Sequence, residues 1–246
     1  MIRAALRVVI VACAVAASEC PERAAPQLGP PGGAAKSTPD AERQAMVRDQ
    51  LQARGIRDPR VLDAMGTVPR HRFVAEPLRR HAYEDTALPI GRGQTISQPY
   101  VVAFMAEALR LRGGERVLEV GSGSGYAAAV LSRLASEVYG IELEQELYDR
   151  SAVTIRELGY ENVHLRQGDG FAGWPDKAPF DAIVLSCAVE RIPAPLWDQL
   201  AEGGRIVYPQ GGAGELQELV IATKTRSGAH EERLAPVQFV PMRRPR

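Results

Sequence analysis

The chain has 246 residues, enough to bury one substantial core with a small additional lobe but too few for two large domains. Its 30 lysines and arginines balance 30 aspartates and glutamates, which argues against nucleic acid or an anionic membrane as a partner. The three cysteines form no C-x-x-C pair, and the four histidines lack metal-ligand spacing. We therefore expect neither a disulfide framework nor a metal site.

The start of the chain has the composition of an export signal. Residues 1–17, MIRAALRVVIVACAVAA, combine two arginines with an apolar run too short to span a bilayer, followed by small residues. The alternative is a disordered chain start. Residues 18–39 are rich in proline, glycine and alanine, which is typical of a flexible linker. We expect residues 1–39 to be a signal-like segment and linker, ahead of a single domain over residues 40–246.

Two short helices are predicted after the linker. Apolar residues recur at helical spacing from Asp40 until Gly55 ends the pattern. A second helix begins with Asp58 as its N-cap and a proline at the first helical position. These helices predict a small substrate lobe over residues 40–97, ahead of a cofactor-binding α/β core over residues 98–246.

A loop and a third helix are expected next. Gly91 and Gly93 break the chain, and residues 94–97 are predicted to form a polar loop. An apolar helix is predicted from Pro99 to Leu111. Ser97 then lies at the start of this helix, where a serine N-cap satisfies unpaired backbone N–H groups. A cap residue at this position can also have a functional role.

A strand, a glycine-rich turn and a helix follow one another within residues 116–136, RVLEVGSGSGYAAAVLSRLAS. This order makes the first half of a nucleotide-binding βαβ unit. Strands and helices then alternate, with strands expected at residues 137–141, 162–166, 181–185, 204–207, 217–225 and 238–240, and helices at 126–134, 144–158 and 193–200. The alternation predicts a doubly wound, Rossmann-like α/β sheet with an antiparallel C-terminal edge.

The spacing of the turn glycines bears on the cofactor. A dinucleotide fingerprint reads G-x-G-x-x-G, whereas Gly121, Gly123 and Gly125 form G-x-G-x-G and are followed by Tyr126. The turn also lacks a Walker lysine. An adenosyl cofactor without phosphates needs close approach of the backbone but no phosphate-binding charge. The turn therefore favours S-adenosylmethionine over NAD or ATP.

Three carboxylates stand at the ends of successive expected strands. Glu142 follows the turn by about 20 residues, where a carboxylate can accept from both ribose hydroxyls. Asp169 follows the next strand and can accept from an adenine amino group. Glu119, just before the turn, can hold the positively charged end of the cofactor directly or through water. Each alone is also typical of a surface or capping residue, but their shared placement favours a site.

Several segments resemble the protein-L-isoaspartate O-methyltransferases, in the family's order and across residues 40–242. These segments are VPRHRFV (68–74), ALPIGRGQTISQPY (87–100), VLEVGSGSGY (117–126), GDG (168–170), APFDAIVL (178–185), LAEGGRIVYPQG (200–211) and FVPM (239–242). Many methyltransferases share the G-x-G-x-G turn. The stretch QTISQPY, together with the early VPR and phenylalanine, is highly specific to this family.

The resemblance implies methyl transfer to the α-carboxylate of L-isoaspartyl residues in damaged proteins, with D-aspartyl residues as lesser substrates. It places the active-site serine at Ser97 and substrate contacts at Thr95 and Ile96. The cofactor contacts that it implies are Gly121, Ser122, Gly123, Gly125, Glu142, Asp169, Gly170 and, by a looser alignment, Gln217. The expected partners are isoaspartyl-containing proteins and peptides.

We expect a cytoplasmic monomer without stable membrane insertion, because S-adenosylmethionine is made and held in the cytoplasm. Export to the periplasm or cell envelope through residues 1–17 is the alternative. Neither expectation depends on the core motifs, since residues 1–39 lie outside the family resemblance.

The chain departs from the family pattern after the expected strand at 181–185. Where the family often reads T-A-A-P-P, residues 186–190 read S-C-A-V-E, and Gln210 replaces a usual valine. Cys187 is expected to be a small residue at the pocket edge and not a nucleophile. The departures leave open a same-fold methyltransferase with another carboxylate acceptor. A catalytically silent binding protein and an NAD oxidoreductase are further alternatives; the intact motifs argue against the first, and Tyr126 against the second.

Overall fold

The computed structural model describes residues 38–212 and 214–245. The signal-like segment predicted at residues 1–17, and the predicted linker up to residue 37, lie outside the described residues. Within the described ranges, no helix combines the length and the apolar character that a bilayer crossing requires.

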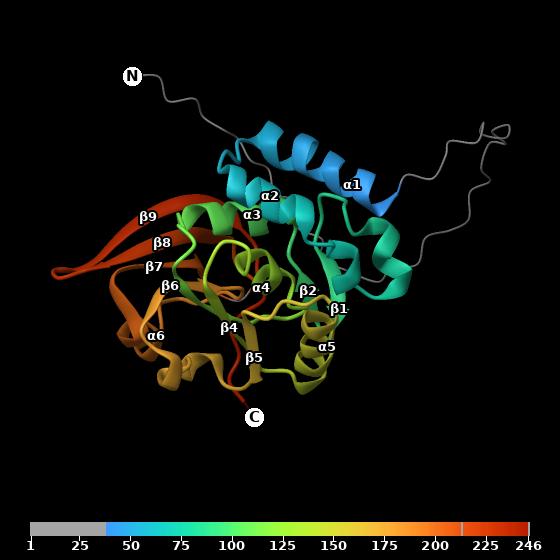
Figure 1. The fold of residues 1–246 in the computed structure, drawn as a ribbon. Helices are drawn as coiled ribbons and strands as arrows, with labels where there is room; N and C mark the ends of the chain where they lie inside the picture. The colour runs from blue at the N-terminus through green and yellow to red at the C-terminus, as the bar shows by residue number, and fades with distance from the viewer. Residues whose placement is uncertain (1–37, 213, 246) are drawn as a thin grey trace, which may run out of the picture.

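A seven-stranded sheet forms the centre of the fold, with strand order β5-β4-β3-β6-β7-β8-β9 (Figure 1). Strands β3 to β7 run parallel, whereas β8 and β9 are antiparallel to their neighbours. The strands are β3 (Arg116–Val120), β4 (Glu137–Glu142), β5 (Val163–Gln167), β6 (Phe180–Leu185), β7 (Leu200–Gln210), β8 (Gln217–Thr225) and β9 (Gly228–Val237). The predicted doubly wound sheet with an antiparallel C-terminal edge is confirmed.

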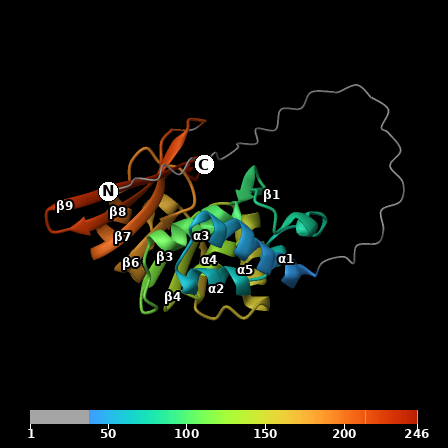
Figure 2. The ribbon, with the colours of Figure 1, turned by 90° about the horizontal axis from the view of Figure 1, so that it is seen from above.

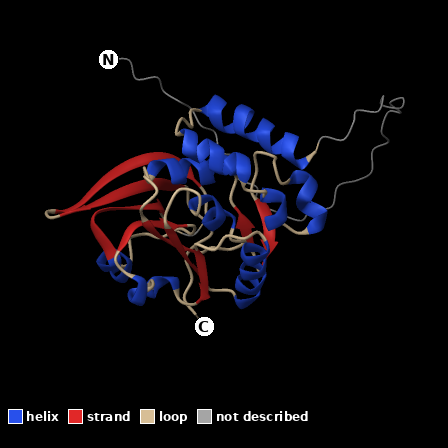
Figure 3. Cartoon of the chain, in the orientation of Figure 1, coloured by secondary structure: helices blue, strands red, loops and turns tan. Residues whose placement is uncertain are grey.

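Helices cover both faces of this sheet (Figure 3). The α-helices are α1 (Pro39–Ala45), α2 (Pro59–Thr67), α3 (Pro99–Ala108), α4 (Tyr126–Leu131), α5 (Gln145–Glu157) and α6 (Ala194–Gln199). A π-helical stretch, Met46–Leu51, extends α1, and short 3-10 turns lie at Gln52–Arg54, Arg70–Phe73, Glu76–His81, Gly170–Ala172 and Pro175–Lys177. Strands β8 and β9 project away from α1 to α5 (Figures 1 and 2).

The central strands are buried on both sides because apolar side chains point alternately to two cores. Along β3, Val117 packs with α2 to α5, whereas Leu118 and Val120 pack with α6 on the opposite face. Nearly continuous apolar runs of this kind are typical of parallel strands that are covered on both faces. The arrangement leaves the carboxyl ends of the parallel strands on one edge, where ligands of such sheets bind.

The predicted boundaries of the early helices are confirmed where local signals set them. Gly55 ends the first helical segment in the left-handed conformation, with φ of 99°. Asp58 caps α2, because its side chain accepts a hydrogen bond from the Arg60 N–H. Helix α3 ends at Ala108 and not at the predicted Leu111, since Arg110 adopts a φ of 52° that ends the helix.

The polar loop predicted at residues 94–97 is wrong. Strands β1 (Leu88–Gly91) and β2 (Gln94–Ile96) form an antiparallel hairpin. Arg92 and Gly93 connect them with φ values of 54° and 71°, the positive values of the tight turns that suit hairpin twist. An arginine is an unusual residue for the first of these positions, so the sequence did not indicate the turn.

The predicted last strand, at residues 238–240, is also wrong, because the edge strand β9 ends at Val237. The chain beyond it crosses to the segment after β6, where Ala188 N donates to Val240 O at 2.8 Å and Met242 N donates to Ala188 O at 2.9 Å. This crossing brings the C-terminal segment 239–244 to the carboxyl edge of the sheet.

We expect Asp58→Ala to lower the free energy of unfolding by about 1 kcal/mol, because the N-cap of α2 is lost. Hydrogen bonding to Arg60 holds the pKa of Asp58 below its usual range. The contribution of Asp58 is therefore present at neutral pH and is lost as the pH falls through its lowered pKa. Chemical denaturation measures the change. Asp63→Ala, on the same helix and mostly exposed, is the matched control; equal effects of the two substitutions would contradict the prediction.

Candidate active site

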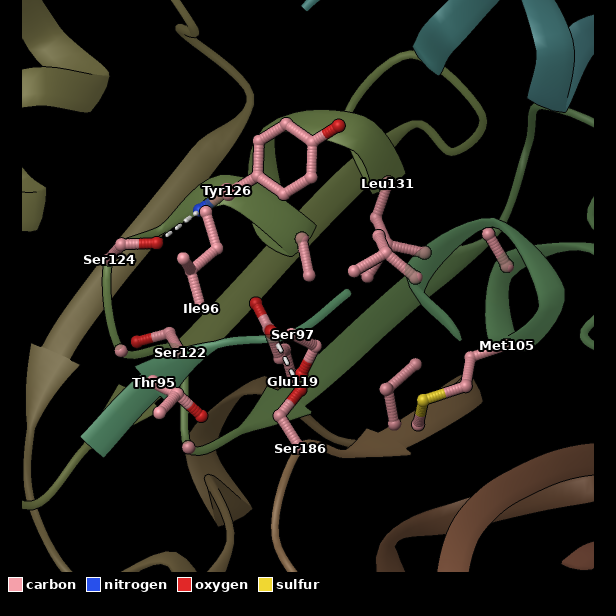
Figure 4. A pocket seen from close by; sticks show the side chains of 16 residues that line it. Thr95, Ile96, Ser97, Met105, Glu119, Ser122, Ser124, Tyr126, Leu131 and Ser186 are labelled. Carbon is pink, nitrogen blue, oxygen red and sulfur yellow. Dashed lines mark hydrogen bonds between the residues drawn. The ribbon is translucent and has the colours of Figure 1, made fainter. Parts of the chain in front are cut away.

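Two adjoining cavities lie at the carboxyl ends of β3, β4 and β6, where the strand order reverses direction. Both are open to solvent. We name them the Ser97 cavity (Figure 4) and the Glu142 cavity, after the residue that lines each. Their shared lining residues are Thr95, Gly121, Gly123 and Ser186. The two cavities are therefore halves of one cleft, divided at the glycine turn.

The glycine turn is held against the end of β4. The N–H groups of Gly121 and Ser122 both donate to Ile141 O, at 2.8 and 3.1 Å. Gly121, Gly123 and Gly125 have φ values of 84°, 54° and 84°, which favour glycine. A Cβ at Gly123 would also stand 3.2 Å from the Ile90 side chain. Gly121 and Gly123 thus present bare backbone to both cavities, as close approach of an adenosyl group requires. Gly125 lines neither cavity; a Cβ there would lie 3.3 Å from Ser151 and from Ile155 of α5.

Glu142 lies at the end of β4 and is 6% exposed. Its carboxylate accepts hydrogen bonds from Gly123 N at 2.7 Å and from Glu144 N at 2.9 Å. A carboxylate has about four acceptor positions, so the two backbone bonds fix its orientation and leave capacity toward the cavity. This geometry fits a group that accepts from ribose hydroxyls.

Glu119 is buried at the end of β3, with 1% of its surface exposed. One carboxylate oxygen, Oε1, accepts from the Ser186 hydroxyl at 2.9 Å, while the buried Oε2 has no partner among the described residues. Burial raises the pKa of Glu119 to about 7. A buried acceptor that lines the Ser97 cavity without a partner fits the positively charged end of the predicted cofactor.

Asp169 and Gly170 are placed differently from one another. Gly170 lines the Glu142 cavity, and a Cβ there would lie 2.4 Å from the Val120 side chain and 3.0 Å from Met242. Asp169 caps the following turn by accepting from Phe171 N at 2.9 Å, and it lines neither cavity in this structure. The predicted pair thus lies at the edge of the Glu142 cavity, with Gly170 inside and Asp169 beside it.

Gln217 is not brought together with the other predicted cofactor contacts. It is fully buried, accepts from Phe239 N at 2.7 Å and donates to Phe239 O at 3.1 Å. It lines neither cavity. In this structure Gln217 therefore has a structural role in place of the predicted cofactor contact. It fixes the C-terminal segment 239–244, which forms one wall of the Glu142 cavity.

The predicted substrate residues line the Ser97 cavity together. Ile96 is buried, Thr95 is exposed at the rim, and Ser97 is partly buried between them and α3. The predicted N-cap role of Ser97 is wrong, because Gln98 is the N-cap of α3 and Pro99 is its first residue. The helix begins at Pro99 as predicted, so the residue directly before it, Gln98, holds the cap position, and Ser97 lies one residue further out. In the described structure the Ser97 hydroxyl has no hydrogen-bond partner, so it is available to a ligand.

The sequence did not reveal the wall formed by the C-terminal segment. Val240, Pro241 and Met242 of the FVPM motif line the Glu142 cavity. Arg243 follows them and binds Glu144 at 2.8 Å, and Arg92 from the β1–β2 turn binds the same carboxylate at 3.3 Å. The hairpin and the C-terminal segment thus meet at one residue beside Glu142.

Cys187 lines the Glu142 cavity at its edge. It is buried, and burial raises the pKa of its thiol to about 12. A thiol that stays protonated at neutral pH is a poor nucleophile. Its position agrees with the predicted role of a small lining residue.

The chain is similar to known proteins both in sequence and in structure. The family model described as Protein-L-isoaspartate(D-aspartate) O-methyltransferase (PCMT) matches residues 41–245. Protein-L-isoaspartate O-methyltransferase 2 of Anaeromyxobacter sp. (strain Fw109-5) is 66% identical over 96% of this chain and 94% of its own length. The protein-L-isoaspartate O-methyltransferase of Opitutus terrae is 55% identical over 82% of this chain and 87% of its own.

Solved structures agree. A protein-L-isoaspartate O-methyltransferase superposes with a TM-score of 0.74 at 30% identity, over 81% of this chain and 65% of that one. A structure from Plasmodium falciparum, assigned to the same family and in complex with S-adenosyl-L-homocysteine, gives a TM-score of 0.72 at 28% identity, over 82% and 98%. These matches confirm the resemblance found in the motifs, and the chain belongs to the protein-L-isoaspartate(D-aspartate) O-methyltransferase family.

Proposed function

We propose that the chain transfers a methyl group from S-adenosylmethionine to the α-carboxylate of L-isoaspartyl residues, and less readily to D-aspartyl residues, in damaged proteins. One observation carries the proposal beyond family membership. The free hydroxyl of Ser97, from the family-specific stretch QTISQPY, lines the same cavity as the glycine turn and the buried Glu119.

S-adenosylmethionine, when bound, supplies an electrophilic methyl group on a sulfonium. Its ribose hydroxyls and its positively charged ammonium group need different partners. Glu142 would accept from the ribose hydroxyls, and Glu119 would hold the positively charged end through Oε2. The bare backbone of Gly121 to Gly123 would lie against the adenosyl group, with Gly170 and Asp169 at the adenine side.

The acceptor needs orientation more than activation. A carboxylate with an ordinary pKa near 4 is ionised at neutral pH, so no general base is required. We assign Ser97 to donate a hydrogen bond to this carboxylate and to orient one oxygen toward the methyl group. Thr95 and Ile96 would border the peptide, and the N-terminal end of α3 would favour the negative charge. The methyl ester would then cyclise to a succinimide without further help from the enzyme.

An apolar wall borders one side of the cleft. Val102, Met105 and Leu131 line the Ser97 cavity from α3 and α4. Apolar surroundings strengthen the hydrogen bond that Ser97 can donate. The cleft therefore suits a reaction in which positioning supplies most of the catalysis.

A same-fold methyltransferase with another carboxylate acceptor is the second candidate, because residues 186–190 depart from the family pattern. The structure links two of the departures: Gln210 Nε2 donates to Glu190 O at 3.4 Å, and Val189 N donates to Pro209 O at 3.0 Å. The altered residues therefore support one another on the segment after β6. A changed peptide preference is the property that this segment would affect.

A methylation assay separates these candidates. The full chain is incubated with radiolabelled S-adenosylmethionine and either an isoaspartyl peptide or the same peptide with a normal aspartyl linkage. Label transfer to the isoaspartyl peptide alone supports the proposal. Equal labelling of both peptides would favour another acceptor, and binding of the cofactor without transfer would favour a catalytically silent protein.

We further propose that residues 40–246 form a single methyltransferase domain that acts as a cytoplasmic monomer. The supply of S-adenosylmethionine in the cytoplasm supports a cytoplasmic location, whereas the signal-like composition of residues 1–17 supports export. N-terminal sequencing of the natural protein after cell fractionation decides between them. Light scattering on the purified chain measures the oligomeric state.

We expect Ser97→Ala to lower kcat/KM for an isoaspartyl peptide by about ten- to a hundredfold, the value of one hydrogen bond to a charged group. Binding of S-adenosylhomocysteine, measured by calorimetry, should stay within about twofold of wild type, because Ser97 contacts the acceptor. Ser227→Ala, in the turn between β8 and β9, is the control. Undiminished methylation by Ser97→Ala would remove Ser97 from the proposed role.

We expect Glu142→Ala to weaken S-adenosylhomocysteine binding at least about tenfold, because the ribose acceptor and the anchor of Gly123 are lost together. Calorimetric titration measures this effect. Glu161→Ala removes an exposed carboxylate after α5 and serves as the matched control. The assigned ribose site would be untenable if both variants bound the cofactor product with equal affinity.

A further inference from the structure

A side-chain hydrogen bond joins two adjacent strands inside the cleft. Ser186 follows β6 directly, and its hydroxyl donates to Glu119 Oε1 at 2.9 Å (Figure 4). Strands β3 and β6 are paired in parallel register, with Glu119 opposite Val184. Both side chains line the Ser97 cavity. The pair is therefore set by the sheet itself and not by a mobile loop.

The surroundings of Glu119 give its negative charge little other support. The titratable groups that face it are the Glu142 carboxylate from β4 and the Cys187 thiol after β6, and neither is a cation. The backbone N–H of Ala128 in helix α4 also lowers the pKa of Glu119, although it lies outside hydrogen-bonding geometry with either carboxylate oxygen. Cys187 Sγ is directed to Val120 O, at 3.9 Å. Among the described residues, Ser186 is thus the one side chain that donates to Glu119.

We propose that Ser186 is a positioning residue for the cofactor: its hydroxyl fixes Glu119 Oε1, favours the ionised carboxylate and leaves Oε2 to accept from the cofactor's ammonium group. This inference rests on the proposed function, since it assumes that the cleft binds S-adenosylmethionine. It gives a task to the first residue of the departure at 186–190, where the family often has a threonine. Serine and threonine both keep the required hydroxyl.

The affinity for the cofactor should depend on pH through the ionisation of Glu119. Burial raises the pKa of Glu119 to about 7, whereas the bond from Ser186 lowers it. Without this donor the pKa is higher, so at neutral pH fewer molecules have an ionised Glu119 to bind the ammonium group. Raising the pH restores the ionised form. Loss of the hydroxyl should therefore weaken binding most at low pH and least at high pH.

The test uses calorimetric titration of S-adenosylhomocysteine, which carries the same ammonium group and is not turned over. The full chain and its variants are compared from about pH 6 to about pH 8, below or near the pKa of an α-amino group. Near pH 7, Ser186→Ala should bind about tenfold more weakly than wild type. The difference should shrink as the pH rises, and Ser186→Thr should recover the wild-type profile.

Two further variants make the result specific. Glu119→Gln removes the titrating group. When Ser186→Ala is added to Glu119→Gln, the pH profile of binding should therefore not change further. Ser132→Ala is the matched control, because Ser132 is also a buried serine but donates to the backbone, to Ala129 O at 2.8 Å. It should leave the pH profile of binding unchanged.

A merely structural role of Ser186 would weaken binding by the same factor at every pH, and that outcome would overturn the proposal. So would a Ser186→Thr variant as impaired as Ser186→Ala. The methylation assay with an isoaspartyl peptide distinguishes failure of the positioning role of Ser186 from failure of the proposed function. Wild-type methylation with an unshifted Ser186→Ala profile refutes the positioning role alone, whereas shifted binding without methylation refutes the proposed acceptor.

Discussion

The hydrogen bond from Gly123 N to Glu142 is the constraint on which the rest of the cleft depends. It ties the middle of the glycine turn to the end of β4, at 2.7 Å, while Ile141 O accepts from the two preceding N–H groups. The turn is then fixed in the left-handed geometry that exposes its backbone to both cavities. Because the Ser97 cavity and the Glu142 cavity meet at this turn, its position fixes how the two halves of the cleft adjoin.

The parts of the fold that local chemistry determines could be predicted from the sequence. The parallel strands, the cap at Asp58, the stop at Gly55 and the carboxylates at the strand ends each follow from residue type and short-range spacing. The β1–β2 hairpin could not be predicted, because its turn places Arg92 at a positive φ. The predicted start of α3 at Pro99 is confirmed, whereas its cap is Gln98 and not Ser97.

The C-terminal segment 239–244 could not be predicted for a different reason: long-range contacts set its course. Ala188 and Gln217 hold it by backbone and amide hydrogen bonds, and neither contact has a local sequence signal. Gln217 was expected to touch the cofactor, whereas in the structure it supports a wall of the cavity. The ion pairs of Arg243 and Arg92 with Glu144 are partly exposed, so each contributes little alone. Their value lies in joining three separate elements beside Glu142.

The two buried carboxylates of the cleft differ in their hydrogen-bond partners, and this difference suits them to different groups of the cofactor. Glu142 has two backbone donors and lines the cavity where neutral hydroxyls are expected. Glu119 has one side-chain donor, a buried oxygen without a partner, and a pKa that burial raises to about 7. An acceptor with so little support is a better match for a cation than for a neutral group, because the cation compensates the buried charge. The same glycine turn would thus separate the proposed site for the ribose hydroxyls from the proposed site for the ammonium group.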